Sequence, residues 1–281
     1  MKPNQKLLKG SLYHLFVIIF GFVMLYPVLW MICSSFKDNN QIFNTASLIP
    51  SQLNFAAYIR GWNDGVGGLP FLIFFKNSLF YVIIATIGTV LSSAFVAYGF
   101  ARIKFKGKSF WFGCMLLSMM LPFQVVMIPQ FIIFFKIHWT NSLLPLLVPA
   151  FLSHPFFVFL MVQFIRGLPI ELDESAKIDG CGRFGIFTRI VFPLITPALI
   201  TSTIFQFYWR WDDFMGPLLY LDKPRMYTVS LAMRMFADPG TTTDYAAMFA
   251  MGTLSLIPII IVFLVFQKYL VEGISTTGMK G

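Results

Sequence analysis

Charged residues are scarce in this sequence. Asp, Glu, Lys and Arg make up 12% of its 281 residues, whereas 57% are hydrophobic. Soluble domains carry about 25% charged residues, so this chain has too few polar side chains to cover a water-soluble globule of its size. The mean hydropathy of +0.75 is typical of a protein whose surface faces lipid. The sequence therefore predicts an integral membrane protein.

Cysteine and histidine are also rare, and neither shows the spacing of a metal site or a redox pair. No GxxxxGK[ST] loop occurs, so ATP would have to be bound by another chain. The apolar stretches contain no nucleophile with a base and no paired carboxylates. We therefore expect no disulfide, metal site, cofactor or catalytic residue in this chain. Its cysteines and histidines are Cys33, Cys114, Cys181, His14, His138 and His154.

Long apolar stretches are what the chain has in quantity. A membrane helix needs about twenty apolar residues, and six stretches qualify, near 12–34, 76–101, 109–133, 142–165, 193–216 and 246–270. The first continues into Pro27 and Trp30 instead of ending in a cleavage site, so we expect it to stay as a membrane helix. The fold class that follows is an all-α membrane protein with six transmembrane helices.

Lysine and arginine indicate the orientation, because basic loops are retained in the cytoplasm. Residues 1–11 and 102–108 contain Lys and Arg but no acid. Both termini and the loop at 168–197 are then cytoplasmic, and the loops at 36–75 and 217–245 are extracytoplasmic. The net charge of +9 follows this topology, so we expect no nucleic acid partner. We divide the chain into a first helix with its outer loop, 1–75, and a core of five helices, 76–281.

The 168–197 segment is a polar interruption between two apolar stretches. Pro169 and the acids Glu171, Asp173 and Glu174 suit the first turn of a helix, and Gly180 suits its end. We predict a short helix near 170–179, a glycine break and an amphipathic helix from about 184. Taken alone, this pattern also fits a hairpin that lies on the lipid surface.

The same segment resembles the EAA loop of permease subunits in ATP-binding-cassette (ABC) importers. The resemblance is carried by residues 174–180 (ESAKIDG) with Phe187, Ile190, Pro193 and Pro197, and it departs at Ser175 and Cys181, where alanine is usual. It implies that a coupling helix between the fourth and fifth spans docks into a cytoplasmic ATPase. The residues that the resemblance assigns to coupling are Glu174, Ser175, Ala176, Asp179, Gly180, Phe187 and Pro193.

Further stretches are similar to the second permease of maltose-type carbohydrate importers. They are Ser35 to Lys37, Asn77 with Ser78, 97–102 (AYGFAR), Met120 to Pro122, Trp211 to Phe214 and the end from Val271. The resemblance implies a type I importer permease in a bacterial inner membrane that carries a carbohydrate, an oligosaccharide more than a monosaccharide. It also implies a homologous permease as partner, two ATPase subunits that bind MgATP and an extracytoplasmic solute-binding protein.

Polar groups inside the apolar stretches are candidates for the solute pathway. They are Gln124, Gln130, Gln206, Tyr208, Trp209, Trp211 and Asp212, with Arg210 and Asp213 beside them. Broken helices at Pro122 and Pro129 would shape this pathway, although both prolines also fit simple packing kinks. The alternative for the aromatic residues is an interfacial belt, with Arg210 paired to Asp212 or Asp213.

A stand-alone secondary transporter of small polar solutes is the alternative function. An ion-coupled transporter of this kind would show inverted repeats and ionisable groups in the middle of the membrane, and the sequence displays neither.

Overall fold

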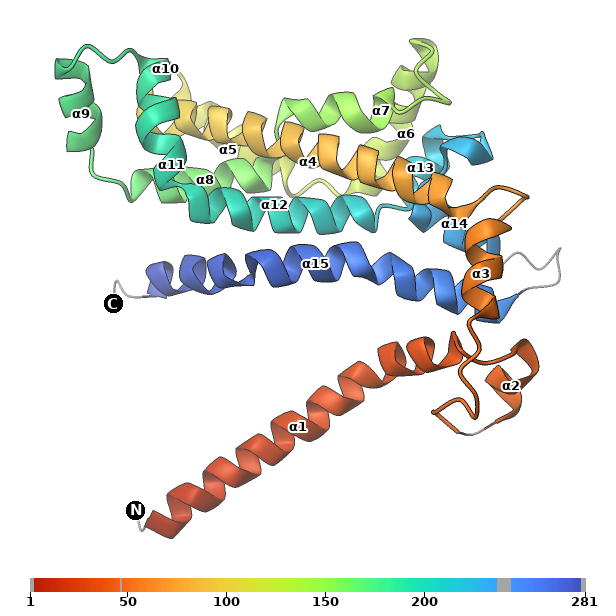
Figure 1. The fold of residues 1–281 in the computed structure, drawn as a ribbon. Helices are drawn as coiled ribbons and strands as arrows, with labels where there is room; N and C mark the ends of the chain where they lie inside the picture. Colours follow the sequence, from red (N-terminus) through yellow and green to blue (C-terminus); the bar gives the residue numbers. More distant parts are fainter. Residues whose placement is uncertain (1–2, 46, 237–243, 279–281) are drawn as a thin grey trace. The chain divides into compact units, whose positions relative to one another are not determined.

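All regular structure in the described residues is helical (Figure 1). The computed structural model describes residues 3–45, 47–236 and 244–278, and within them one isolated bridge joins Val66 to Leu69. The predicted all-α fold is confirmed. The chain forms two compact units: unit 1 is Met1–Leu72 with Met233–Ile257, and unit 2 is Ile73–Ala232 with Pro258–Gly281. The division predicted at residue 75 stays a prediction.

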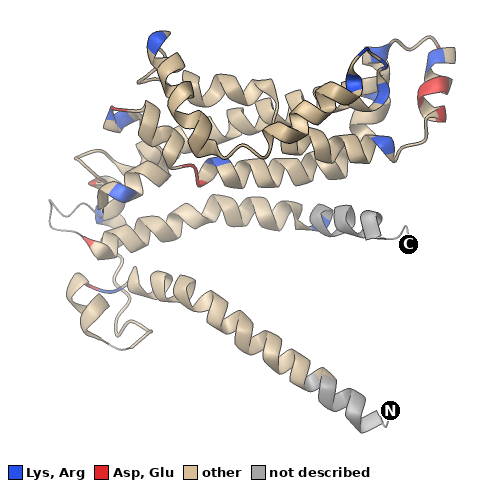
Figure 2. Ribbon diagram, turned by 180° about the vertical axis from the view of Figure 1, so that it is seen from behind, with Lys and Arg blue, Asp and Glu red and all other residues tan. Residues whose placement is uncertain are grey.

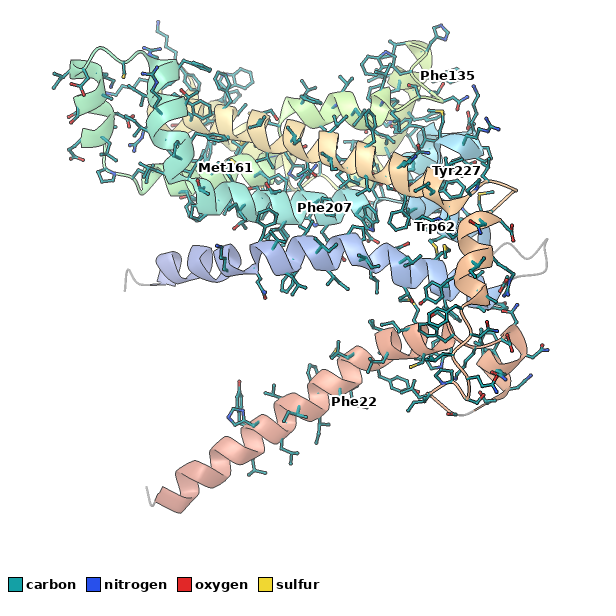
Figure 3. The ribbon with its side chains drawn as sticks, in the orientation of Figure 1. Phe22, Trp62, Phe135, Met161, Phe207 and Tyr227 are labelled. Carbon is teal, nitrogen blue, oxygen red and sulfur yellow. The ribbon has the colours of Figure 1, made fainter. Side chains whose placement is uncertain are left out.

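Unit 1 begins with a long apolar helix whose side chains face outward. Between Leu12 and Ser34 its mean hydropathy is 2.5, and nearly all residues from 12 to 28 are exposed. Phe22, labelled in Figure 3, is 58% exposed. Such a surface is stable in lipid and not in water. The helices of this unit are α1 (Pro3–Ser34), α2 (Asn39–Asn44), α3 (Ala56–Asn63) and parts of α14 (Val229–Phe236) and α15 (Tyr245–Gly278).

Helix α3 packs closely on the start of α15. A Cβ added to Gly61 would lie 2.9 Å from Cε and 3.0 Å from Cγ of Met251, so a larger residue at this position would require the Met251 side chain to move. Arg60 donates a hydrogen bond to Asp244 at 2.9 Å beside it. Helix α3 is thus held against the start of α15 by packing at Gly61 and by the Arg60–Asp244 hydrogen bond.

Unit 2 is built around α4 (Phe71–Arg102). Small side chains such as Ala94 and Ala97 are fully buried on α4 and let its neighbours approach closely. Met161 of α8 and Ala198 of α12 belong to the same core. The other helices are α5 (Lys108–Ser118), α6 (Phe123–Lys136), α7 (Leu144–Leu147), η1 (Val148–Leu152), α8 (Pro155–Arg166), α9 (Glu171–Ile178), α10 (Arg183–Ile186), the π-helix η2 (Phe187–Val191), α11 (Phe192–Leu194), α12 (Thr196–Trp211), α13 (Met215–Tyr220) and η3 (Pro224–Met226).

The described residues contain 4 helical stretches long and apolar enough to cross a membrane, or up to 6 if each of two bent pairs is one span. These four stretches are Leu12–Ser34, Phe71–Arg102, Leu144–Arg166 and Tyr245–Lys268. The bent pairs are Lys108–Ser118 with Phe123–Lys136, at 98°, and Arg183–Leu194 with Thr196–Trp211, at 75°. The predicted count of six requires both bent pairs to be single spans.

Two prolines of the bent pair α5 and α6 have different effects. Pro122 explains the bend between the two helices, whereas Pro129 does not break α6. Pro122 has an extended backbone, with φ −65° and ψ 140°, and α6 begins after it, as predicted. Pro129 lies inside α6, which continues through it, so of the two alternatives at this position a packing kink fits and a broken helix does not. Helices in membranes tolerate an interior proline where neighbouring groups satisfy the freed carbonyl.

A further interruption separates η1 from α8. Ser153 has a positive φ of 70°, and the backbone N–H groups of Ser153 and His154 donate to the hydroxyls of Ser92 and Ser93 on α4, both at 3.0 Å. Pro155 then opens α8, and a residue before proline avoids helical geometry. The hydroxyls of α4 thus satisfy the amides that this interruption frees.

Candidate functional site

Helix α9 is the predicted short helix of the 168–197 segment, and its ends are built as the sequence indicates. Its first turn holds acids and its last turn holds Lys177, which matches the helix dipole. Gly180 has φ +80°, its N–H donates to the Lys177 carbonyl at 3.1 Å, and the Cys181 N–H donates to the Ala176 carbonyl at 2.9 Å. This pair of hydrogen bonds is a Schellman cap. The predicted helix and its glycine break are confirmed.

One face of α9 is buried in unit 2 and the other is exposed. Asp173 and Ala176, one turn apart, are 3% and 6% exposed. Glu174, Ser175 and Ile178 lie on the opposite side, and Ile178 is 87% exposed. In Figure 1, α9 lies past the ends of α4 and α8, and Figure 2 shows that it carries charge of both signs while α4 and α8 are uncharged along most of their length. Unit 2 therefore presents one side of a short capped helix.

The second half of the segment is folded against α4. Phe187, 7% exposed, packs on the rings of Tyr98 and Phe95, with ring centroids 5.3 Å and 5.7 Å apart. Pro193 lies in the first turn of α11 and is exposed. Of the residues assigned to coupling, Ala176 and Phe187 are therefore core positions of unit 2. Glu174, Ser175, Asp179, Gly180 and Pro193 are exposed.

A pocket of about 560 Å³ opens in unit 2 between α6, α7, η1, α12 and α13. Gln130, Gln206, Trp209 and Asp212 of the predicted pathway residues line it, together with Phe123, Pro145, Leu146, Pro149, His154, Arg210, Asp213, Phe214, Met215, Gly216 and Tyr220. The pathway candidates Gln124, Tyr208 and Trp211 do not line it. Trp211 is buried instead, stacked on Phe207 at 5.9 Å, and Tyr208 is 48% exposed.

Arg210 and Asp213 compensate each other at the pocket. Tyr81 donates to Oδ2 of Asp213 at 2.8 Å and accepts from Nη1 of Arg210 at 3.1 Å. The Arg210 and Asp213 side chains are 3.7 Å apart, and the Gly216 N–H donates to Oδ1 of Asp213 at 3.0 Å. The pairing of Arg210 with Asp213 is the second of the two pairings that the sequence allows. It neutralises Arg210 and Asp213, whereas Asp212 adds a second carboxylate to the pocket lining.

The remaining polar groups are held in fixed positions. Gln206 is 1% exposed, and its Nε2 donates to Oγ1 of Thr89 on α4 at 3.0 Å. Trp209 stacks on Phe157 at 5.3 Å and lies 5.7 Å from His154. His154, whose role the sequence did not indicate, has a buried Nδ1 without a hydrogen-bond partner among the described residues. No three His, Cys, Asp or Glu side chains of the described residues are placed to hold a metal.

The part of the chain that contains α9 and the pocket matches a known family. The model of the binding-protein-dependent transport system inner membrane component matches residues 86–276. The match covers the pocket helices and the whole 168–197 segment. The chain belongs to this family.

Relatives match over nearly the full chain. The probable ABC transporter permease protein YurM of Bacillus subtilis is 34% identical over 100% of this chain and 92% of its own length. The arabinooligosaccharides transport system permease protein AraQ of Halalkalibacterium halodurans is 32% identical, over 93% of each chain. The predicted resemblance to ABC importer permeases is therefore confirmed.

A solved structure has the same fold. A chain of a bacterial ABC transporter involved in the import of the acidic polysaccharide alginate superposes with a TM-score of 0.85. That match covers 96% of this chain and 99% of the other at 20% identity. The likeness extends the agreement beyond the matched family region to the first helices of the chain.

Proposed function

We propose that this chain is the transmembrane permease subunit of a carbohydrate importer driven by ATP hydrolysis on partner subunits. The observation that carries the proposal is the exposed face of α9, held by a Schellman cap on a segment between two membrane stretches. A short helix with one buried and one exposed face can be displaced by a protein bound to its exposed face. The buried face then transmits this displacement to the core of unit 2. Family membership supports this reading.

The proposed assembly contains a homologous permease, two cytoplasmic ATPase subunits that bind MgATP, and an extracytoplasmic solute-binding protein. The chain itself is not an enzyme and needs no cofactor. Glu174, Ser175, Asp179 and Gly180 would face the ATPase, because they are exposed on α9 and its cap. Ala176 and Phe187 would instead hold the segment to unit 2. Both termini would be cytoplasmic, in a bacterial inner membrane.

The proposed substrate is an oligosaccharide. Aromatic faces with amide groups suit a sugar, whose rings have an apolar face and a hydroxyl rim, and Trp209 with Gln130 and Gln206 offers this combination at the pocket. The name of the AraQ relative, a permease for arabinooligosaccharides, supports the same class.

Gly180 provides the test. Proline cannot adopt its φ of +80°, whereas asparagine tolerates this region. In membranes that contain the whole complex, we expect Gly180→Pro to leave the chain inserted but to abolish solute-dependent ATP hydrolysis and uptake. Gly180→Asn should retain both activities.

The matched control is Gly182→Ala. Gly182 has an ordinary φ of −71°, and a Cβ added there meets nothing within 4 Å. This variant should resemble the wild type. Recovery of the wild-type chain without an ATPase subunit, or wild-type uptake by Gly180→Pro, would contradict the proposed function.

A further inference from the structure

The cytoplasmic-loop helix α9 is joined to α4 by an arginine that neither the family match nor the resemblance assigns a role. Nη2 of Arg102, the last residue of α4, donates to the Leu168 carbonyl at 2.8 Å and lies 3.4 Å from the Pro169 carbonyl. Its Nε lies 3.4 Å from Oδ2 of Asp173 on α9. One side chain therefore contacts both the residues that lead into α9 and the first turn of α9.

This ion pair is buried. The side chains of Arg102 and Asp173 are 9% and 5% exposed. Buried pairs of this kind cost much desolvation energy and are not an efficient source of stability, but loss of one partner is strongly destabilising. The pair is also incompletely hydrogen-bonded, because Nε of Arg102 and Oδ1 of Asp173 have no hydrogen-bond partner among the described residues. A small shift of α9 could therefore improve or weaken the pair.

Helix α4 also contacts the second half of the 168–197 segment, which begins at Arg183. The Tyr98 hydroxyl donates to the Arg183 carbonyl at 3.1 Å, and Phe95 and Tyr98 pack on Phe187. Movement of either half therefore acts on the same end of α4.

The first half and the middle of α4 contact residues that line the pocket. Tyr81 hydrogen-bonds Asp213 and Arg210, and Thr89 holds Gln206. Tyr81 and Arg102 are separated by about 30 Å along a continuous helix, at 1.5 Å per residue. Close-packed helices move as bodies because their interiors resist compression.

We propose that the contact between Arg102 and Asp173 transmits a displacement of α9 to α4. The movement of α4 in turn changes how accessible the pocket is to solvent and solute. Arg102 is a positioning residue in this proposal, which rests on the proposed function. In this proposal the ATPase docks on the exposed face of α9, whereas the displacement passes to α4 through the buried face of α9.

The test uses the purified complex in lipid vesicles, with the native cysteines replaced by serine and Met215, a half-exposed residue at the pocket, changed to cysteine. The readout is the rate at which a membrane-impermeant maleimide labels this cysteine, with and without MgATP and vanadate. We expect the nucleotide-dependent change in rate to fall at least about fivefold in Asp173→Asn and in Arg102→Gln, the low end of measured coupling factors. The double variant should be no worse than either single one, because the two residues act as a unit.

Co-purification of the ATPase subunits separates transmission from assembly. The subunits should be recovered in wild-type amounts with Asp173→Asn, which keeps the Arg102 contacts to the Leu168 carbonyl. Lys104→Gln, an exposed cation two residues beyond Arg102, is the matched control and should keep the full response. Loss of the ATPase subunits from Asp173→Asn, or a full nucleotide response in both single variants, would overturn the proposal. Failure of the wild-type chain to retain ATPase subunits would instead contradict the proposed function.

Discussion

Single residues decide how tightly the pocket cluster is packed. Asp213 accepts hydrogen bonds from Tyr81 and from the Gly216 amide, and this arrangement leaves no room beside Gly216. A Cβ at this position would lie 2.7 Å from Oδ2 of Asp213 and 3.0 Å from Cδ2 of Leu146. Neither neighbour can move without disturbing the α12–α13 turn or the wall of the pocket. Gly216 is thus a steric requirement of this cluster.

We expect Gly216→Ala to destabilise the purified complex by about 1–3 kcal/mol, the usual cost of overpacking. Thermal unfolding in detergent would measure this loss as a lower midpoint temperature. Gly113→Ala is the matched control, because Gly113 lies in α5 with nothing within 4 Å of an added Cβ. An unchanged midpoint for Gly216→Ala would show that Asp213 is not held as described.

Asp244 predicts a pH dependence at the start of α15. Burial raises the pKa of its carboxyl, but hydrogen bonds from Arg60 and the Ala247 amide outweigh burial, so the net pKa is lowered. A carboxyl with a lowered folded-state pKa stabilises the fold above its unfolded pKa, and this contribution is lost as the pH falls through the folded value.

Hydrogen exchange of the 244–250 segment would measure the effect. After correction for intrinsic exchange rates, protection should be constant near neutral pH and fall below about pH 4, the ordinary range of Asp. In Asp244→Asn, protection should be lower at neutral pH and should not change further with acidification. A wild-type protection that rises on acidification would contradict the sign of the shift.

At the scale of elements, local signals in the sequence were sufficient for α9. Its acids, Lys177 and Gly180 act within the helix itself, so the sequence predicted its bounds to within one residue. The pocket depends on how helices are rotated about their axes, which no local signal shows. Tyr208, Trp209 and Trp211 are near neighbours in sequence, yet Trp209 lines the pocket, Trp211 is buried and Tyr208 is exposed. The Arg102–Asp173 contact joins distant segments and was missed for the same reason.

Asn77 and Ser78 show what the start of α4 does for a neighbouring element. Nδ2 of Asn77 donates to the carbonyls of Arg225 and Tyr227, at 2.8 Å and 3.0 Å, and the Val229 N–H donates to the Ser78 hydroxyl at 2.7 Å. These hydrogen bonds hold η3 and the first turn of α14 against α4. The sequence marked both residues only by resemblance.

We expect Asn77→Ala to loosen this segment without unfolding unit 2. Each hydrogen bond contributes about 0.5–1.5 kcal/mol, so the amides of residues 222–229 should exchange several-fold faster, measured by mass spectrometry on the purified complex. Lys76→Ala, an exposed neighbour on α4, should leave exchange unchanged. Equal exchange in wild type and Asn77→Ala would show that the asparagine does not hold the segment.

At the scale of the whole molecule, contacts inside unit 2 constrain the topology. Arg102 contacts Asp173, so the end of α4 and the 168–197 segment lie on the same side of the membrane. Asn77 contacts residues 225–227, so the start of α4 and that loop share a side as well. Because α4 itself is long and apolar enough to span, these two sides are opposite ones. The positive charges after α4 then predict which of them is cytoplasmic.

Cysteine labelling in right-side-out membrane vesicles would check this orientation. With the native cysteines replaced by serine, Lys104→Cys should react with an impermeant maleimide only after permeabilisation, whereas Asp222→Cys should react at once; both positions are exposed. Asp222 is a suitable reporter because it lies just before η3, within the loop that Asn77 holds against the start of α4. Labelling of Lys104→Cys in intact vesicles would show the opposite orientation. The proposed ATPase subunits could then not reach α9, because ATP is supplied in the cytoplasm. The orientation and the proposed direction of coupling therefore stand or fall on the same measurement.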